Sequence, residues 1–181
     1  MRSRVVFTGT YRRALDGKLR VLLPKRLRSA IPDGAGLFLT PGTDHCLELH
    51  TTQSLSQLGT RASQSSASSK NVRSFSRLFY ARAEQCDLDK QGRIRIPTTL
   101  AKLADIETEV VFIGVGFHWE LWNDQLWEAY LDQHGDAFDQ IAQATFDPRG
   151  DELQAGINLK DQNTIQKLSV NEPTAEKTLP R

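Results

Sequence analysis

The sequence lacks the long apolar segment that a membrane-spanning helix needs. No apolar run in the 181 residues approaches the roughly 18 residues required to cross a bilayer. The apolar stretch after the basic N-terminus is too short for the core of a signal peptide. We therefore expect a cytoplasmic protein that contacts no membrane. The two cysteines, Cys46 and Cys86, have no metal-ligand spacing and suggest no disulfide framework, so we interpret both as small apolar residues.

Sequence motifs of metal, nucleotide and nucleophilic chemistry are also missing. The four histidines have no metal-binding spacing, and the sequence contains neither H-E-x-x-H nor a C-x-x-C pair. It contains no glycine-rich phosphate loop and no nucleophile elbow. We therefore expect no enzyme activity, no cofactor, no metal and no small-molecule ligand.

The net charge is only +1, but this average hides a strong segregation of charge along the chain. Residues 1–30 carry nine basic residues and one acidic residue, and residues 70–102 carry eight basic and three acidic residues. Residues 103–146 carry nine acidic residues and neither lysine nor arginine. Such asymmetry favours a polyanionic partner such as nucleic acid. In an alternative interpretation, the oppositely charged segments neutralise one another within or between subunits.

The most informative feature is a nine-residue phrase that occurs twice. Residues 16–24 read D-G-K-L-R-V-L-L-P and residues 89–97 read D-K-Q-G-R-I-R-I-P. Both contain an aspartate, an arginine four residues later, and an apolar run that ends at proline. The similarity continues downstream, where residues 36–40 align with 109–113 and residues 47–49 with 119–121. This repetition indicates one supersecondary unit that is present twice.

The alternation of apolar and turn residues predicts an α+β protein that is mainly β. Each repeat is predicted to hold strands on both sides of its aspartate turn, a short helix after the proline, and two further strands. Residues 72–83 are predicted to form an amphipathic helix, and a further helix is predicted from Asn123 or Asp124 to about Gln143. We expect a first module at 5–55, a linker and helix at 56–78, a second module at 79–146, and a polar, disordered tail at 147–181.

The repeated aspartate and arginine are the first candidate site residues. Asp16 and Asp89 have a structural role that needs no function, because an aspartate at a strand end accepts turn amides and pairs with an arginine four residues on. Arg20 and Arg93 each open a strand directly after the turn. From there a guanidinium can hold a phosphate or a guanine edge with two parallel bonds.

Other basic residues around the two turns are candidate phosphate contacts, which position a protein on DNA without reading its sequence. Alternatively, they are solvated surface charges. Lys18 aligns with Gln91, and Lys90 aligns with Gly17, so we expect the two repeats to bind unequally. The candidates are Lys18, Arg12, Arg13, Lys90 and Arg95.

Two copies of Asp-x-x-x-Arg-x-x-x-Pro, each followed by a short helix and strands, resemble the MraZ family. These are bacterial transcriptional regulators encoded at the head of the division and cell-wall gene cluster. The similarity covers about residues 5–146 and is strongest in C-D-L-D-K-Q-G-R-I-R-I-P at 86–97 and F-H-W-E-L-W at 117–122. The resemblance implies two tandem AbrB-like, swapped-hairpin modules that intertwine into one pseudo-twofold β-core with flanking short helices.

The resemblance also implies a function and a set of DNA contacts. It implies ring-shaped, octamer-like homo-oligomers that bind repeated elements in the promoter DNA of their own operon, at the nucleoid. Arg20, Arg93 and Lys18 match the family's DNA contacts by position, on turns formed by Asp16, Gly17, Asp89 and Gly92. The family has glycine directly before the motif arginine. Gly92 fits this pattern, but Leu19 stands there in the first repeat, so the family pattern does not fix the first turn.

Two other functions remain open at this point. An AbrB-like antitoxin would bind a toxin and repress transcription, but such proteins usually carry a single module of this kind. A purely structural assembly protein would use its charged segments to join subunits and would bind no nucleic acid. The tandem repeat and the basic turns favour a sequence-specific DNA-binding transcriptional regulator.

Overall fold

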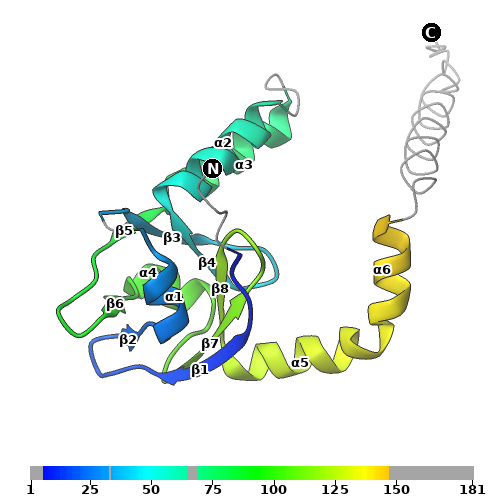
Figure 1. Cartoon of the computed structure of the whole chain (residues 1–181). Coiled ribbons are helices and arrows are strands. Elements are labelled where there is room, and N and C mark those ends of the chain that lie inside the picture. Colours follow the sequence, from blue (N-terminus) through cyan, green and yellow to red (C-terminus); the bar gives the residue numbers. More distant parts are fainter. Residues whose placement is uncertain (1–5, 33, 65–68, 147–181) are drawn as a thin grey trace, which may run out of the picture. The chain divides into compact units, whose positions relative to one another are not determined.

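The computed structural model of the chain describes residues 6–32, 34–64 and 69–146 (Figure 1). The chain divides after Leu131 into two compact units. The first unit contains both repeats, and each unit is described by itself. The predicted tail at 147–181 lies outside the described residues, as does residue 5 at the predicted start of the first module.

The two repeats contain the same elements in the same order, which confirms the prediction of a mainly-β α+β protein. The first repeat comprises β1 (Thr10–Ala14), β2 (Arg20–Leu22), α1 (Lys25–Ala30), β3 (Leu37–Pro41) and β4 (Leu47–Thr51). The second comprises β5 (Glu84–Cys86), β6 (Arg93–Arg95), α4 (Thr98–Leu103), β7 (Glu109–Gly114) and β8 (Trp119–Trp122). Between the repeats lie α2 (Thr52–Gln64) and α3 (Lys70–Tyr80). After them follow α5 (Asp124–His134), the 3-10 turn η1 (Gly135–Ala137) and α6 (Phe138–Phe146).

The repeats are intertwined through their strands. Six strands form one antiparallel sheet in the order β1-β7-β8-β4-β3-β5, while β2 and β6 form a separate two-stranded ribbon. The first strand of each repeat pairs with the third strand of the other, β1 with β7 and β5 with β3. If each strand is replaced by its equivalent in the other repeat, the same strand order results, read from the opposite edge of the sheet. A pseudo-twofold axis therefore passes between β4 and β8 and between β2 and β6, as expected for a swapped-hairpin core.

The ribbon stands on the hydrophobic core and is fixed there by alternate residues. Val21 and Ile94, at the centres of β2 and β6, are fully buried, as are Leu23 and Ile96. Because side chains alternate between the faces of a strand, the neighbouring residues point to the opposite face. Each fully buried aliphatic side chain contributes about 1.5–3 kcal/mol to folding. The core therefore holds the ribbon rigidly.

Prolines set the transition from ribbon strand to helix in both repeats. Pro24 and Pro97 have extended backbone angles and directly precede α1 and α4. Proline has no N–H to continue a ladder, which ends the strand. One turn later Leu27 and Leu100 are each buried to 1% exposure, and they anchor the two short helices against the core.

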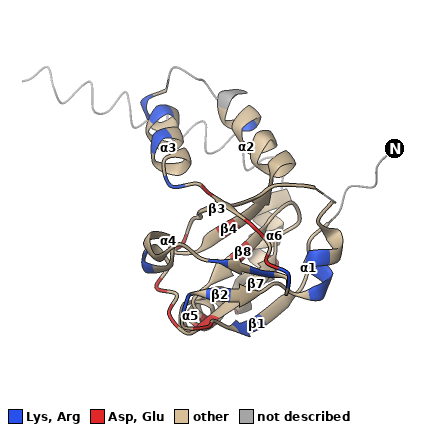
Figure 2. Ribbon diagram, turned by 90° about the vertical axis from the view of Figure 1, so that its left-hand side faces the viewer, with Lys and Arg blue, Asp and Glu red and all other residues tan. Residues whose placement is uncertain are grey.

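Two helices occupy most of the segment between the repeats. The linker and helix predicted at 56–78 contain most of α3 and the C-terminal part of α2, which extends to Gln64. The start of α2 is a capping box, in which Thr51 N donates to Ser54 Oγ (3.0 Å) and Ser54 N donates to Thr51 Oγ1 (3.2 Å). Helices α2 and α3 lie side by side as a hairpin that projects from the sheet (Figures 1 and 2).

The helix predicted from residue 124 to about 143 is interrupted at Gly135, where η1 separates α5 from α6. Glycine is a poor helix former, which explains the break at this residue. In the described part of the chain, no helix has both the length and the apolar character needed to span a bilayer.

Candidate nucleic-acid interface

The first aspartate turn is closed by a carboxylate that accepts three hydrogen bonds. Asp16 Oδ1 accepts the backbone N–H groups of Lys18 (2.9 Å) and Arg20 (3.0 Å). Asp16 Oδ2 accepts Arg20 Nε–H (2.7 Å) and also lies 2.7 Å from Arg20 Nη2. The hydrogen bond from the Arg20 side chain holds the pKa of Asp16 well below its usual range, and the same contact raises the pKa of Arg20.

The second turn repeats this arrangement. Asp89 Oδ1 accepts the backbone N–H groups of Gln91 and Arg93, both at 2.9 Å, and Asp89 Oδ2 accepts Arg93 Nε–H at 2.7 Å. The backbone bond from Arg93, followed by its side chain, lowers the pKa of Asp89. Both aspartates are therefore turn acceptors, and each fixes the direction of the arginine four residues later.

Leu19 adopts the conformation that the family pattern assigns to glycine. Its φ is +56°, beside +78° for Gly92 at the equivalent position. Leu19 N donates to Asp16 O (2.9 Å), and Ile96 N donates to Leu19 O (2.9 Å). The equivalent bonds around Gly92 are also present, at 2.8 and 3.1 Å. The first turn therefore has the same geometry as the second, although a leucine occupies the left-handed position.

Gly17, placed by sequence in the first turn, is not among the glycines with positive φ. A Cβ added to it would meet no atom within 4 Å. A Cβ added to Gly92 would instead lie 2.5 Å from Arg28 Nη1 and 2.7 Å from Arg28 Cδ. Gly92 therefore differs from Gly17 in its positive φ and in the Arg28 side chain, which would have to move to make room for a Cβ.

Pairing of β2 with β6 joins the two turns into one surface. The register places Arg20 opposite Arg95 and Leu22 opposite Arg93. Arg93 Nη1 also lies 3.7 Å from Asp16 Oδ2, so the second arginine reaches the first turn. The outward face of the ribbon, opposite the buried Val21 and Ile94, therefore carries four side chains, which are Arg20, Leu22, Arg93 and Arg95.

Five of the seven predicted contacts lie on this ribbon and its turns. Arg20 and Arg93 retain 35% and 25% side-chain exposure, while Lys18, Lys90 and Arg95 are exposed. Leu22 also lies on the outward face with 41% exposure. It was not predicted, although the alternation with buried Val21 and Leu23 was a signal for it.

The two arginines of β1 are placed differently. They are the other two predicted contacts. Arg13 is half-buried, and its Nη1 donates to Arg12 O (2.7 Å). Arg12 Nε donates to Asp124 Oδ1 (2.7 Å), and Arg12 also pairs with Glu128. Arg12 therefore fastens α5 to β1, and its charge is neutralised there.

Helix α1 is more basic than its counterpart α4, and its Arg28 reaches Gly92 of the second turn. Its exposed Lys25, Arg26 and Arg28 have one basic counterpart in α4, Lys102. Figure 2 shows lysine and arginine on α1 and β2. In the candidate interface, the two repeats therefore have the same backbone arrangement, but the first repeat carries more basic charge than the second.

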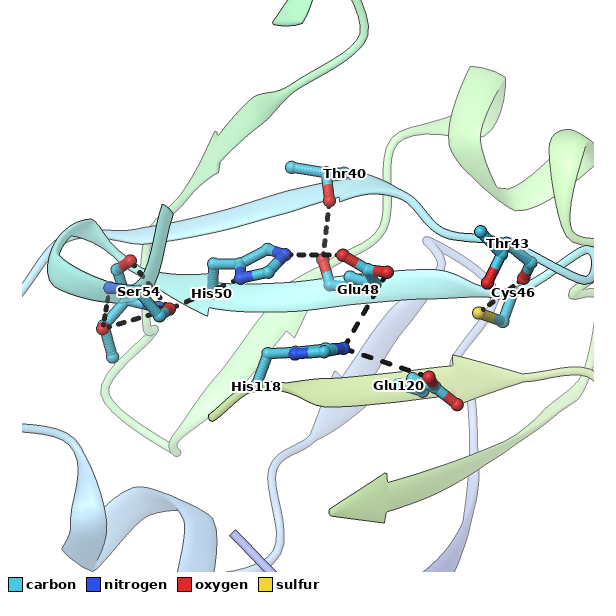
Figure 3. A network of polar contacts seen from close by, with 9 residues as sticks. Thr40, Thr43, Cys46, Glu48, His50, Ser54, His118 and Glu120 are labelled. Carbon is cyan, nitrogen blue, oxygen red and sulfur yellow. Dashed lines mark hydrogen bonds and ion pairs between the residues drawn. The ribbon is translucent and has the colours of Figure 1, made fainter. Parts of the chain in front are cut away.

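A second polar cluster lies at the pseudo-twofold axis, on β4 and β8 (Figure 3). Glu48 and Glu120 are directly opposite each other in the strand register, an arrangement that is unfavourable for like charges. His50 Nε2 lies 2.8 Å from Glu48 Oε2, and Trp122 Nε1 donates to Glu120 Oε2 (2.8 Å). His118 Nε2 lies 3.8 Å from Glu48 Oε1 and 3.9 Å from Glu120 Oε1.

The order Ser54–His50–Glu48 in this cluster resembles that of a hydrolytic triad, but its geometry fits a structural clasp. Ser54 Oγ lies 3.4 Å from His50 Nδ1 and is engaged by Thr51 in the capping box. His50 is only 3% exposed, and it lines a cavity of about 500 Å³ together with Glu48, Ser54 and His118. Burial lowers the pKa of His118 and raises the pKa of Glu120, which reduces the charge at this axis. The cluster ties α2 to β4.

Neither cysteine nor histidine forms a metal site in the described residues, where no group of three or more metal-binding side chains is present. Cys46 and Cys86 are buried and unbridged. Burial raises the pKa of Cys86 to about 11 and raises the pKa of Cys46. Both thiols therefore stay protonated at neutral pH and pack as small apolar side chains.

Comparison with known proteins gives one family. The family model described as "MraZ protein, putative antitoxin-like" matches residues 6–78 and 79–149. The "Transcriptional regulator MraZ" of Halothermothrix orenii is 37% identical over 142 residues, which cover 78% of this chain and 98% of the relative. That of Ligilactobacillus salivarius is 35% identical with the same coverage. That of Alkaliphilus oremlandii is 37% identical over 137 residues, which cover 76% of this chain and 94% of the relative.

Proposed function

The chain belongs to the MraZ family, and from this premise we propose that it is a sequence-specific DNA-binding transcriptional regulator that reads promoter DNA with the β2–β6 ribbon. The relatives are named transcriptional regulators, which is not an enzyme class. The observation that carries the proposal is the outward face of the ribbon. It presents three arginines on a rigid base, and the two turn aspartates orient two of them.

A two-stranded ribbon is a suitable element for direct readout. The major groove of B-DNA admits such a ribbon, and arginine binds the O6 and N7 edge of guanine with two parallel hydrogen bonds. Arg20, Arg93 and Arg95 supply guanidinium groups, and Leu22 supplies an apolar contact for a thymine methyl group. The buried Val21 and Ile94 hold this face in place, so binding requires little ordering of the ribbon.

The aspartates prepare the arginines for this role. Asp16 and Asp89 hold the Nε side of their arginines, which leaves N–H groups on the outer side of each guanidinium for DNA. A guanidinium fixed in this way loses less rotational freedom when it binds a base. The aspartates are therefore positioning residues, and the arginines are the proposed contacts.

Basic residues beside the ribbon supply the sequence-independent part of binding. Lys18 and Lys90 lie at the tips of the two turns, and Arg13 lies on the neighbouring strand β1. Contacts of this kind with phosphates release counterions and make affinity fall as salt rises. Because α1 is more basic than α4, we expect the first repeat to contribute more phosphate contacts than the second.

A single ribbon is a small reader, so we propose that the protein acts as a ring-shaped homo-oligomer on repeated promoter elements. Each DNA element then binds the ribbon of one subunit. Because the subunits are linked in the ring, simultaneous binding of several elements raises the apparent affinity without new contacts per subunit. We propose the promoter of its own division and cell-wall operon as the target, with the protein acting in the cytoplasm at the nucleoid. We also propose that residues 5–55 and residues 79–146 are the two AbrB-like modules of each subunit.

The test is the double variant Arg20→Ala/Arg93→Ala, measured by fluorescence anisotropy with a promoter fragment. Loss of two bidentate contacts, each worth about 1–3 kcal/mol, should weaken binding by roughly 30-fold or more. The matched control Arg20→Lys/Arg93→Lys keeps the charge and removes the planar fork, so it should recover only part of the affinity. Circular dichroism and the unfolding midpoint establish that each variant is folded. Unchanged affinity in a folded double variant would contradict the proposal.

A further inference from the structure

We propose that the α2–α3 hairpin of one subunit is the docking surface for the acidic segment α5–α6 of a second subunit, so that subunits join head to tail. The inference rests on the homo-oligomer of the proposed function and specifies which two surfaces form it. Both surfaces carry exposed apolar side chains, and they have opposite charge.

The hairpin is basic throughout. Residues 51–83 contain no aspartate or glutamate, and Lys70, Arg77 and Arg82 are exposed on or directly after α3. Figure 2 shows this basic charge on α3, above the sheet. The hairpin therefore presents a surface of one sign, outside the ribbon proposed to bind DNA.

The same hairpin exposes large apolar side chains. Phe79 is buried, but Phe75 is 45% exposed, Leu78 is 56% exposed and Tyr80 is 44% exposed. An amphipathic helix normally buries its apolar stripe, and contiguous exposed apolar surface marks interaction sites. Phe75 and Leu78, three residues apart on one helical face, are therefore the apolar centre of a contact that the single chain leaves open.

An open groove between α2 and α3 completes this surface. It encloses about 470 Å³, with Gly59, Ala62 and Ser76 among the lining residues and Tyr80 and Arg77 at its side. A Cβ on Gly59 would lie 2.6 Å from Tyr80 Oη, so a side chain there would displace the Tyr80 hydroxyl from its place beside the groove. A groove with small residues in its lining and aromatic and basic residues beside it suits an aromatic side chain from an acidic partner.

The segment α5–α6 has the complementary properties. Residues 103–146 contain no lysine or arginine, and no residue of α6 is buried. Phe138 is 70% exposed, Ile141 is 48% exposed and Phe146 is 83% exposed. Asp136 and Asp139 flank Phe138 on the exposed surface. An apolar row beside carboxylates is the counterpart of the apolar and basic hairpin.

Each surface exposes large apolar side chains, and a second subunit can supply the partner that each needs. The two surfaces differ, so their pairing is heterologous, and each subunit has one of each. Heterologous contacts give closed rings when the rotation between subunits closes. Opposite charge sets the register of the contact, while aromatic side chains supply most of its affinity.

The experiment is a charge exchange between two folded variants of the full chain. Arg77→Glu/Arg82→Glu makes the hairpin acidic, and Asp136→Lys/Asp139→Lys makes the helical segment basic. In sedimentation velocity without DNA, each variant alone should lose the oligomer that the wild type forms at the same concentration. An equimolar mixture should recover it, because each reversed surface then meets a surface of opposite charge. Variants that keep the wild-type size, or a mixture of folded variants that stays dissociated, would overturn the interface.

The apolar part is tested at Phe138. Phe138→Asp should raise the dissociation constant between subunits at least tenfold, while the matched variant Phe138→Leu should change it by less than threefold. Equal assembly of Phe138→Asp and wild type would overturn the proposed role of this side chain.

Binding of a promoter fragment with a single element separates the interface from the proposed function. The charge-exchange variants retain the ribbon, so each should bind this fragment within threefold of the wild-type affinity. If Arg77→Glu/Arg82→Glu assembles normally but loses DNA, the hairpin is a nucleic-acid surface and the interface proposal fails, whereas a DNA-binding function stands. If it loses assembly and keeps DNA, both proposals stand.

Discussion

The two aspartate turns reach one geometry from different sequences. In the second repeat Gly92 takes the left-handed conformation before the arginine, and in the first repeat Leu19 takes it. The hydrogen bonds from aspartate to the turn and to the arginine agree within about 0.1 Å between the repeats. The conformation is therefore imposed by the aspartate and by pairing of the ribbon strands, and glycine is not needed to produce it.

The difference lies in what surrounds each turn. A leucine in the left-handed region costs roughly 1–2 kcal/mol, but Leu19 also packs its side chain against the core, which offsets part of that cost. At Gly92 the space of a Cβ is occupied by Arg28. In the second turn, glycine therefore relieves the strain of a positive φ and leaves room for the Arg28 side chain of α1.

The repeats also differ in the charge they present on a shared backbone. Arg95 of β6 occupies the position that Leu22 occupies in β2, and three basic residues of α1 correspond to one in α4. The pseudo-twofold axis therefore relates two equal scaffolds with unequal surfaces. Exchanging residues between equivalent positions tests whether that inequality matters.

The largest effect on stability is expected when Gly92 of the second turn is replaced by leucine. Gly92→Leu should lower the free energy of unfolding by about 2 kcal/mol, since it adds left-handed strain and displaces Arg28. The reciprocal Leu19→Gly should change it by less than about 1 kcal/mol, because relief of strain and loss of packing nearly cancel. Urea denaturation measures both.

Gly17→Ala is the matched control for these glycine exchanges. Gly17 has open space around it, so the change should be neutral or stabilising by up to about 1 kcal/mol. Equal loss of stability in Gly92→Leu and Gly17→Ala would show that the two turns do not differ in the way described.

A smaller effect, on DNA binding, is expected when β2 and β6 are given the same residue at the equivalent positions 22 and 95. Arg95→Leu gives β6 the residue of β2 and should weaken promoter binding about threefold to tenfold, with a drop of about 0.9 in the slope of log affinity against log salt if Arg95 contacts a phosphate. Leu22→Arg should strengthen binding by a similar factor. Anisotropy titrations at several salt concentrations measure both slopes. If neither exchange alters affinity or slope, the outward face of the ribbon does not contact DNA.

Much of the fold followed from the repeated phrase. Two aspartates, two arginines and two prolines in register predicted two equivalent units, and the strand pairing confirms that they intertwine. Composition predicted a linker and a helix at 56–78 but did not fix the end of α2 at Gln64, because serine, glutamine and alanine suit both linkers and helices. The capping pair Thr51 and Ser54 was the local signal for its start.

The candidate site was predictable in part. Local spacing placed Arg20 and Arg93 after their turns, but the reach of Arg93 to Asp16 depends on the pairing of distant strands. The engagement of Arg12 by α5 is equally non-local. Leu19 was uncertain from sequence because propensity disfavours leucine at positive φ, and here tertiary contacts override it.

The most direct test of the central claim is photo-crosslinking to a promoter fragment. A benzoylphenylalanine replaces Leu22 or Arg95 on the ribbon, Leu78 on the hairpin, or exposed Val115 as a control, each in the full-length protein. The ribbon account predicts crosslinks to DNA from positions 22 and 95 and none from positions 78 and 115. Crosslinks from position 78 with none from the ribbon positions would contradict it.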